Sequence, residues 1–153
     1  FNTYGPRQSA RAIIPTIITQ ILSGKKKILL GNLNAKRDLN FVKDVVNAFV
    51  EISNCKLAIG EEINIASETE ISVMQLANKI LKILDSDAKI VSKKSRLRPK
   101  ESEVDRLLGS SEKLQSITKW KPKVNIDEGL KETIEWFKDP KILSKYKSMI
   151  YNI

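Results

Sequence analysis

The side chains in this sequence that are best suited to chemistry are two arginines far apart in the chain. Arg37 precedes an aspartate at the start of a predicted strand, and Arg98 lies in a stretch with six Lys and Arg residues from position 89 to position 100 and no acidic residue. A guanidinium group binds two oxygens of an anion with its planar fork and stays protonated. The basic stretch would concentrate positive potential on an incoming anion. The pattern indicates an anionic ligand, and the alternative for Arg37 is a solvent-exposed salt bridge.

Groups that could catalyse a reaction are missing from the sequence. It contains no His that could activate a nucleophile, so its single cysteine, Cys55, is expected to be an unreactive thiol. The six glycines are scattered and do not form the G-x-G-x-x-G cluster that cradles a dinucleotide phosphate. No residues cluster with the spacing of metal ligands. We therefore expect binding residues here, with no catalytic residue and no metal site.

The composition favours one globular domain with an anionic partner. The chain has 153 residues, 41% of them hydrophobic, and a net charge of +9, which suits either nucleic acid or a sugar nucleotide. No apolar run approaches the length of a membrane span, so no membrane contact is expected. The lone cysteine fits a reducing cytoplasm. The first residues do not look like a signal peptide or an initiator, and we interpret them as a cut inside a longer protein.

Hydrophobic periodicity predicts strands that alternate with helices, which indicates an α/β fold with a small mixed sheet. The capping pairs Ser72/Gln75 and Asn125/Glu128 each predict the start of a helix. The predicted strands cover residues 1–4, 27–30, 37–42, 62–66 and 88–91. The predicted helices cover residues 12–23, 45–52, 73–84, 111–117 and 126–137, and one short helix follows residue 139.

Several motifs in this order resemble the NAD-dependent sugar-nucleotide epimerase/dehydratase family, the extended short-chain dehydrogenases. The motifs are FNTYGPR at residues 1–7, KILLG at 27–31, RDLNFVKDVVNAF at 37–49, NIA at 64–66, and RPKE at 98–101. The resemblance implies that residues 1–138 are the sugar-nucleotide-binding, C-terminal portion of such an enzyme, without most of its Rossmann domain. Residues 1–5 would end a Rossmann strand, and residues 139–153 would form a C-terminal tail.

The resemblance implies roles for six substrate-binding residues. In the family, an Asn at the position of Asn2 binds the diphosphate or sugar, and arginines at the positions of Arg37 and Arg98 clamp the diphosphate. The short strand 27–30 would hold the nucleotide base, with Leu30 where Tyr or Phe is usual. The remaining expected substrate-binding residues are Ile13 and Asn64. From the residues alone, a turn Asn is the favoured interpretation of Asn2. Leu30 could equally be ordinary core, and Asn64 a strand-end amide.

The resemblance also implies the cofactor and the partners. Phe1 would lie beside the nicotinamide of NAD, but the chain has no Tyr-x-x-x-Lys pair, so it would be catalytically incompetent alone. The substrate would be a UDP-, GDP- or dTDP-linked sugar, and the run QSARAIIP at 8–15 is most like that of bacterial NAD-dependent 4,6-dehydratases. The parent enzyme would be a homodimer, and this portion could self-associate. A basic nucleic-acid-binding module is the alternative.

One departure from the family concerns the turn KWKP at residues 119–122. The family has Gly before this Trp, whereas this chain has Lys119. Lys119 must therefore adopt a positive φ, or the preceding helix must end with a different cap.

Overall fold

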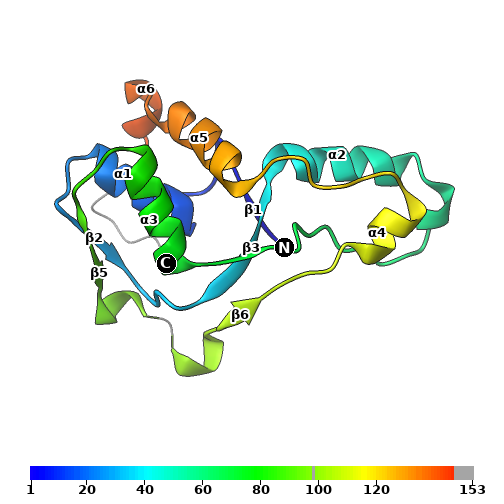
Figure 1. Ribbon diagram of the computed structural model, residues 1–153, viewed down its shortest axis with the longest axis horizontal. Coiled ribbons are helices and arrows are strands. Elements are labelled where there is room, and N and C mark those ends of the chain that lie inside the picture. Colours follow the sequence, from blue (N-terminus) through cyan, green and yellow to red (C-terminus); the bar gives the residue numbers. More distant parts are fainter. Residues whose placement is uncertain (98, 147–153) are drawn as a thin grey trace.

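A computed structural model describes residues 1–97 and 99–146 (Figure 1). These residues form six strands and six α-helices, which mostly alternate up to β6 and end with three consecutive helices. The strands are β1 (Asn2–Tyr4), β2 (Lys27–Leu30), β3 (Lys36–Phe41), β4 (Glu70–Ser72), β5 (Lys89–Ser92) and β6 (Arg106–Leu107). The helices are α1 (Ile13–Leu22), α2 (Val42–Ser53), α3 (Val73–Ile83), α4 (Glu112–Ile117), α5 (Ile126–Phe137) and α6 (Pro140–Leu143).

Strand β3 is the centre of a four-stranded mixed sheet. Its second half pairs in parallel with β1, in the register Asn2 opposite Leu39. Its first half pairs with β4 in antiparallel and with β6 in parallel orientation. The α/β fold with a small mixed sheet, predicted from the sequence, is therefore confirmed.

A second sheet consists of β2 and β5 alone, paired in parallel. The side chain of Gln20, on α1, binds the other edge of β2. It accepts a hydrogen bond from the backbone N–H of Leu29 at 2.9 Å and donates one to the carbonyl of Leu29 at 3.2 Å. Gln20 is 3% exposed, so its amide is a buried and fully used hydrogen-bonding group.

The main core lies where α1, α3 and α5 pack together beside the two sheets (Figure 1). The apolar positions that repeat at helical spacing in each of these helices are buried, as the periodicity predicted. These residues are Ile14, Ile17 and Ile18 on α1, Leu76, Ala77 and Ile80 on α3, and Leu130, Ile134 and Phe137 on α5.

Both predicted capping boxes are present. The Ser72 hydroxyl accepts from the N–H of Gln75, and Asn125 accepts from that of Glu128, while each N3 side chain binds the cap backbone in return. The turn before Trp120 uses a different cap. Lys119 is not among the described residues with a positive φ, which are Arg7, Glu68 and Asp85 outside glycine. Thr118 Oγ1 donates to the Leu114 carbonyl at 2.7 Å and accepts from the Trp120 N–H at 3.1 Å, which ends α4 without a glycine.

The predicted strand at residues 62–66 is wrong. This segment alternates in burial, with Ile63 and Ile65 packed against a small cluster around Trp120 and Asn64 exposed. The alternation is real, but no neighbouring described strand pairs with the segment. Strands β4 and β6 were not predicted, because each is only two or three residues long.

The remaining boundaries differ by up to three residues, with the largest difference at the start of α2. Val42 was expected to end a strand, but it is the first residue of α2.

Within residues 1–97 and 99–146, none of the helices combines the length and the apolar character needed to cross a bilayer.

Candidate functional site

Four of the predicted substrate-binding residues line one cavity of about 210 Å³. Asn2 comes from β1, Ile13 from the start of α1, Leu30 from the end of β2, and Arg37 from β3. These elements meet because β3 pairs with β1 while α1 contacts β2. Four segments that are distant in sequence thus enclose a single site.

Arg37 is a mostly buried cation at this cavity, held by two contacts. Its side chain is 18% exposed, and Nη2 lies 3.5 Å from Oε1 of Glu103, which also lines the cavity. Nη1 donates to the carbonyl of Lys36 at 2.8 Å. Because the described residues use two of the five guanidinium donors, others can bind an anion in the cavity. The salt bridge considered as an alternative exists, but it is long and largely sheltered from solvent.

The walls of the cavity include further charged and polar side chains that the sequence did not single out. Arg11 and Arg96 line the cavity with Arg37, so three guanidinium groups surround it. Arg96 Nη1 also donates to the Leu29 carbonyl at 2.6 Å. The backbone of Arg96 approaches Gly31 so closely that a Cβ at Gly31 would overlap it. Glycine at this position therefore allows the basic segment to close over the end of β2.

The apolar and amide residues differ in their exposure. Leu30 is 1% exposed and belongs to the main core as well as to the cavity wall. Ile13 is half-buried, and the side chain of Asn2 is exposed at the end of β1. Leu30 can thus act both as ordinary core and as an aliphatic wall, so the two interpretations of this residue are compatible.

The other predicted site residues lie apart from this cavity or outside the described residues. Asn64 is exposed and does not line the cavity. Phe1 is 43% exposed, and its ring packs closely against Gly109. Arg98 lies outside the described residues, so the expectation that it faces the same diphosphate as Arg37 remains a prediction.

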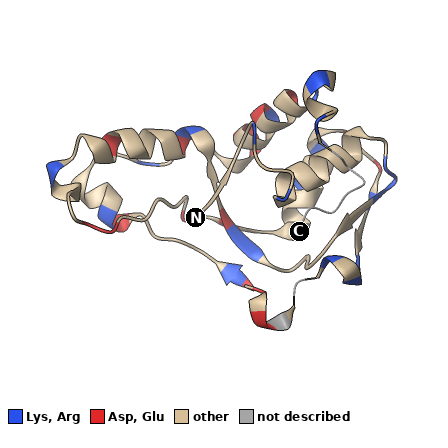
Figure 2. Ribbon diagram, turned by 180° about the vertical axis from the view of Figure 1, so that it is seen from behind, with Lys and Arg blue, Asp and Glu red and all other residues tan. Residues whose placement is uncertain are grey.

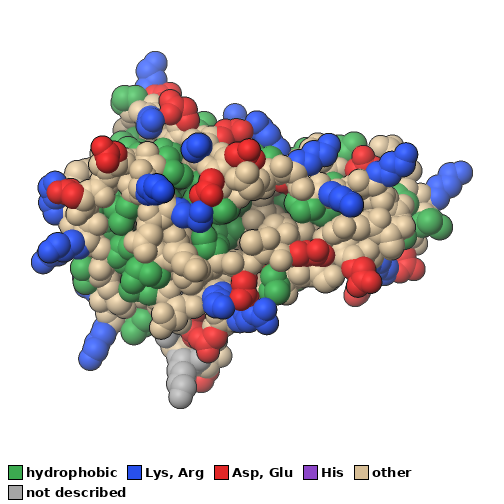
Figure 3. Space-filling model, viewed as in Figure 1, with side chains coloured by type: hydrophobic (Ala, Val, Ile, Leu, Met, Phe, Trp, Pro, Cys, Tyr) green, Lys and Arg blue, Asp and Glu red, His purple; other side chains and the backbone are tan. Residues whose placement is uncertain are grey.

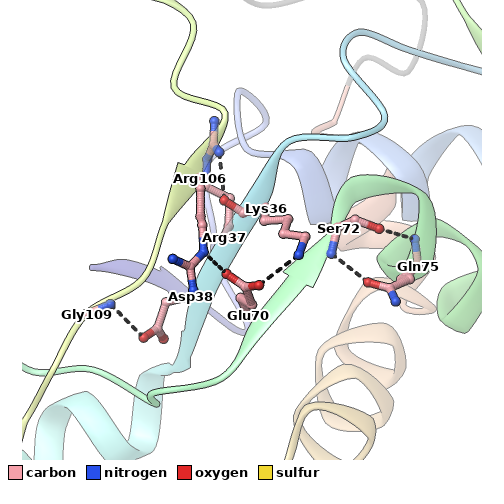
Figure 4. Close-up of polar contacts among 8 residues, drawn as sticks. All are labelled: Lys36, Arg37, Asp38, Glu70, Ser72, Gln75, Arg106 and Gly109. Carbon is pink, nitrogen blue, oxygen red and sulfur yellow. Dashed lines mark hydrogen bonds and ion pairs between the residues drawn. The ribbon is translucent and has the colours of Figure 1, made fainter.

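Asp38, the residue after Arg37, forms a hydrogen-bond network that the sequence did not reveal. Its carboxylate is fully buried and accepts from the backbone N–H groups of Ser67, Glu68 and Gly109 at 3.0, 3.1 and 3.3 Å. It also accepts from the Ser67 hydroxyl at 2.6 Å and from the Asn40 amide at 3.0 Å. Figure 4 shows the Asp38 carboxylate pointing toward the Gly109 N–H. Asp38 therefore ties β3 to two distant loops.

A second charged cluster surrounds Glu70 on β4 (Figure 4). Lys36 Nζ lies 2.8 Å from Oε1 of Glu70, and Arg106 Nε donates to Oε2. The hydrogen bonds from Lys36 and then from Arg106 hold the pKa of the Glu70 carboxyl below its usual value. Figure 2 shows the basic stretches of β3 and β6 lying side by side. Glu70 balances the positive charge that this pairing brings together.

A larger cavity of about 510 Å³ lies elsewhere, between α3 and the start of α5. Its walls are mostly apolar, with Ile71, Val124 and Ile126 among them. Figure 3 shows hydrophobic side chains at the floor of a hollow in this region. None of the five predicted substrate-binding residues that the structure describes lines it, so its size alone does not identify it as the site.

Comparison with known proteins identifies the family of this chain. The model of the GDP-mannose 4,6 dehydratase family matches residues 1–133. A curated dTDP-D-glucose 4,6-dehydratase from Mus musculus is 32% identical over 140 residues, which is 90% of this chain and 39% of that protein. The chain thus spans about two fifths of the length of this relative.

Two solved structures share the fold. The dTDP-glucose 4,6-dehydratase of Bacillus anthracis in complex with NAD has a TM-score of 0.81 at 28% identity, over 95% of this chain and 45% of that chain. The UDP-glucuronic acid 4-epimerase of Bacillus cereus in complex with UDP-glucuronic acid and NAD has a TM-score of 0.81 at 26% identity, over 90% of this chain and 43% of that chain. With the family match over residues 1–133, these likenesses show that the chain belongs to the GDP-mannose 4,6 dehydratase family, within the NAD-dependent epimerases and dehydratases.

Proposed function

We propose that this chain supplies the sugar-nucleotide-binding part of an NAD-dependent 4,6-dehydratase or epimerase. The observation that carries the proposal is the convergence of Asn2, Ile13, Leu30 and Arg37 on one cavity. A sheltered guanidinium beside an aliphatic wall and an amide suits a ligand with an anionic centre, an apolar ring and hydroxyl groups.

Each part of the ligand has a proposed partner. The diphosphate would bind Arg37, with Arg98 as a second cation, because guanidinium groups bind oxyanions through two parallel hydrogen bonds. The base would lie against Leu30, and the amide of Asn2 would bind the diphosphate or the sugar. A role for Asn64 in binding the substrate remains only a prediction, because this residue is exposed and does not line the cavity.

The residues of this chain do not fit a complete NAD site. Its six glycines include no phosphate-cradling cluster, and Phe1 is the single expected contact with the nicotinamide. NAD would serve as the hydride acceptor when it is held by other residues of the whole enzyme. The chain also has no Tyr-x-x-x-Lys pair, so we expect it to bind substrate without catalysing its conversion.

Calorimetric titration of the purified chain with UDP, dTDP and GDP and their glucose or mannose conjugates tests the proposal. We expect Arg37→Gln to weaken binding about tenfold or more, since a hydrogen bond to a charged group contributes about 1.5–3 kcal/mol. Arg106→Gln is the matched control, because Arg106 pairs with Glu70 outside the cavity. Equal binding by the wild type and the Arg37 variant would contradict the proposal, and sugar-nucleotide dehydratase turnover by the chain alone would contradict its catalytic incompetence.

A second titration, with DNA in the presence and absence of UDP-glucose, separates the proposal from a nucleic-acid-binding role, which the net charge of +9 would suit. Figure 3 shows Lys and Arg side chains interspersed with Asp and Glu on the viewed face, and not joined into one basic surface. Salt-sensitive DNA binding that UDP-glucose fails to reduce would favour the nucleic-acid role.

We also expect the isolated chain to self-associate through one face of α2. Val46, Phe49 and Val50 follow helical spacing on this face and are 54%, 63% and 55% exposed. A contiguous exposed apolar surface of this kind favours association. Light scattering over a concentration series measures it, and a constant monomer mass would contradict the expectation. Homodimerisation of the whole enzyme remains a separate prediction.

A further inference from the structure

Gln8 lies in the turn that follows β1 and is anchored at three points. Its backbone N–H donates to the Gly5 carbonyl at 3.3 Å, and its side-chain Nε2 donates to the Thr3 carbonyl at 2.8 Å. Its own carbonyl accepts a hydrogen bond from the Tyr146 hydroxyl at 2.9 Å. Arg7, with a φ of 68°, reverses the chain just before it. The turn thus folds Gln8 back onto β1 and holds its side chain in one orientation.

The remaining polar atom of this side chain, Oε1, is buried and has no hydrogen-bond partner among residues 1–97 and 99–146. The orientation of the amide is not ambiguous, because the Thr3 carbonyl can only accept and so must face the NH₂ group. Buried acceptors in native proteins are nearly always paired. An acceptor that is fixed, buried and unpaired therefore lacks a donor, which a ligand can supply once the neighbouring groups move enough to expose Oε1.

Gln8 also lines the cavity that holds Asn2 and Arg37. A diphosphate offers only acceptor oxygens at neutral pH, so Oε1 would repel it. A sugar offers hydroxyl donors, and an acetamido sugar offers an amide N–H as well. The base is proposed to lie against Leu30 on β2, whereas Gln8 is bonded to β1, the strand that also carries Asn2.

We propose that Gln8 is a specificity-determining residue whose Oε1 accepts a hydrogen bond from a hydroxyl or amide N–H of the sugar. This inference rests on the proposed function, since it assigns the sugar end of the same cavity. It predicts that Gln8 distinguishes a nucleotide sugar from the bare nucleotide, whereas Arg37 acts on both.

The experiment compares wild type and Gln8→Met by calorimetric titration with UDP, UDP-glucose and UDP-N-acetylglucosamine. Methionine preserves the length of the side chain and removes the acceptor. We expect affinity for at least one of the two UDP-sugars to fall about three- to tenfold and affinity for UDP to change less than about twofold. A loss for both sugars identifies a hydroxyl donor, and a loss for UDP-N-acetylglucosamine alone identifies the amide N–H.

Two further variants keep the test decisive. Gln8→Asn retains the amide but withdraws it by one methylene, so it should show the same selective loss if Gln8→Met does not fold. Gln115→Met, on α4 outside the cavity lining, should leave all three affinities unchanged.

The possible failures are distinguishable. An equal loss for UDP and both UDP-sugars would assign Gln8 a structural role and overturn the inference. Unchanged affinity for all three ligands would overturn it as well, while leaving the proposed function intact. A wild-type chain that binds none of the nucleotides would overturn the proposed function and this inference together.

Discussion

Replacing Asp38 with asparagine should destabilise the fold more than any other isosteric change near the cavity. The carboxylate is fully buried, and Oδ2 alone accepts from the backbone N–H groups of Glu68 and Gly109. An amide NH₂ in that position would face both donors and leave them unpaired. A buried donor without a partner costs about 1–3 kcal/mol, so the two together predict a loss of about 2–6 kcal/mol. If the amide turned the other way, its NH₂ group would face the Ser67 N–H and the Asn40 amide, and these two donors would be left unpaired instead.

Urea denaturation of wild type and Asp38→Asn measures this loss as a shift in the unfolding midpoint. Small domains are stable by about 5–15 kcal/mol in total, so the variant should unfold at a much lower urea concentration. In a thermal scan the same loss corresponds to roughly 5–20 °C for a chain of this size.

Asp105→Asn is the matched control. Asp105 is exposed and makes no side-chain hydrogen bond or ion pair with the part of the chain that the structure describes. The same chemical change there should alter the free energy of unfolding by less than about 0.5 kcal/mol. If Asp38→Asn stayed within about 1 kcal/mol of wild type, the network would not carry the stability assigned to it.

Three further changes test the packing around Tyr4 and Trp120. Trp120→Phe keeps an aromatic ring but removes the 3.0 Å hydrogen bond from Nε1 to the Asp44 carbonyl, and urea titration should show a loss of about 1–2 kcal/mol. Gly129→Ala would gain about 1 kcal/mol of helix propensity, but its Cβ would overlap the Tyr4 hydroxyl, so a net loss of about 1–2 kcal/mol is expected; a rise in melting temperature would contradict this. Burial first, and then the charges of Asp44 and Asp127, raise the pKa of Tyr4 above its ordinary value of 10.0. The unfolded chain therefore loses this proton first, and stability should fall as the pH rises above 10; Tyr4→Phe should lose less stability than wild type between pH 9 and 11.

The elements that could be predicted from sequence are those governed by local rules. Helices α3 and α5 begin at Ser72 and Asn125, where a capping side chain lies three residues before Gln75 and Glu128. Their apolar faces repeat at helical spacing, so the core was predictable too. Strand formation depends instead on a neighbouring strand. Residues 62–66 alternate between apolar and polar side chains, as a strand does, but no strand of the described structure pairs with them.

The site was predictable only in part, for a related reason. Family motifs placed Asn2, Leu30 and Arg37 at the ends of strands. Pairing of β1 with β3 brings Asn2 and Arg37 together, while the contact of α1 with β2 adds Leu30 to the same cavity. The partners of Asp38 lie about thirty and seventy residues away in sequence, and no local pattern indicates them. Gln8 gave a weak signal, as the first residue of the run QSARAIIP, but its unpaired oxygen follows from the turn geometry alone.

The way Gln20 binds β2 has a consequence for the behaviour of this protein at high concentration. A two-stranded sheet normally presents free peptide groups to which a strand from another molecule can add, and such addition can propagate into fibrils. On the α1 side of β2, the Gln20 side chain occupies both the N–H and the C=O of Leu29, as a third strand would. Gln20→Leu would leave the Leu29 N–H without this partner and open to a neighbouring molecule, while the Leu29 carbonyl would keep its hydrogen bond from Arg96 Nη1. Thioflavin fluorescence that grows with time in this variant, and not in wild type, would identify one buried amide as a safeguard against aggregation.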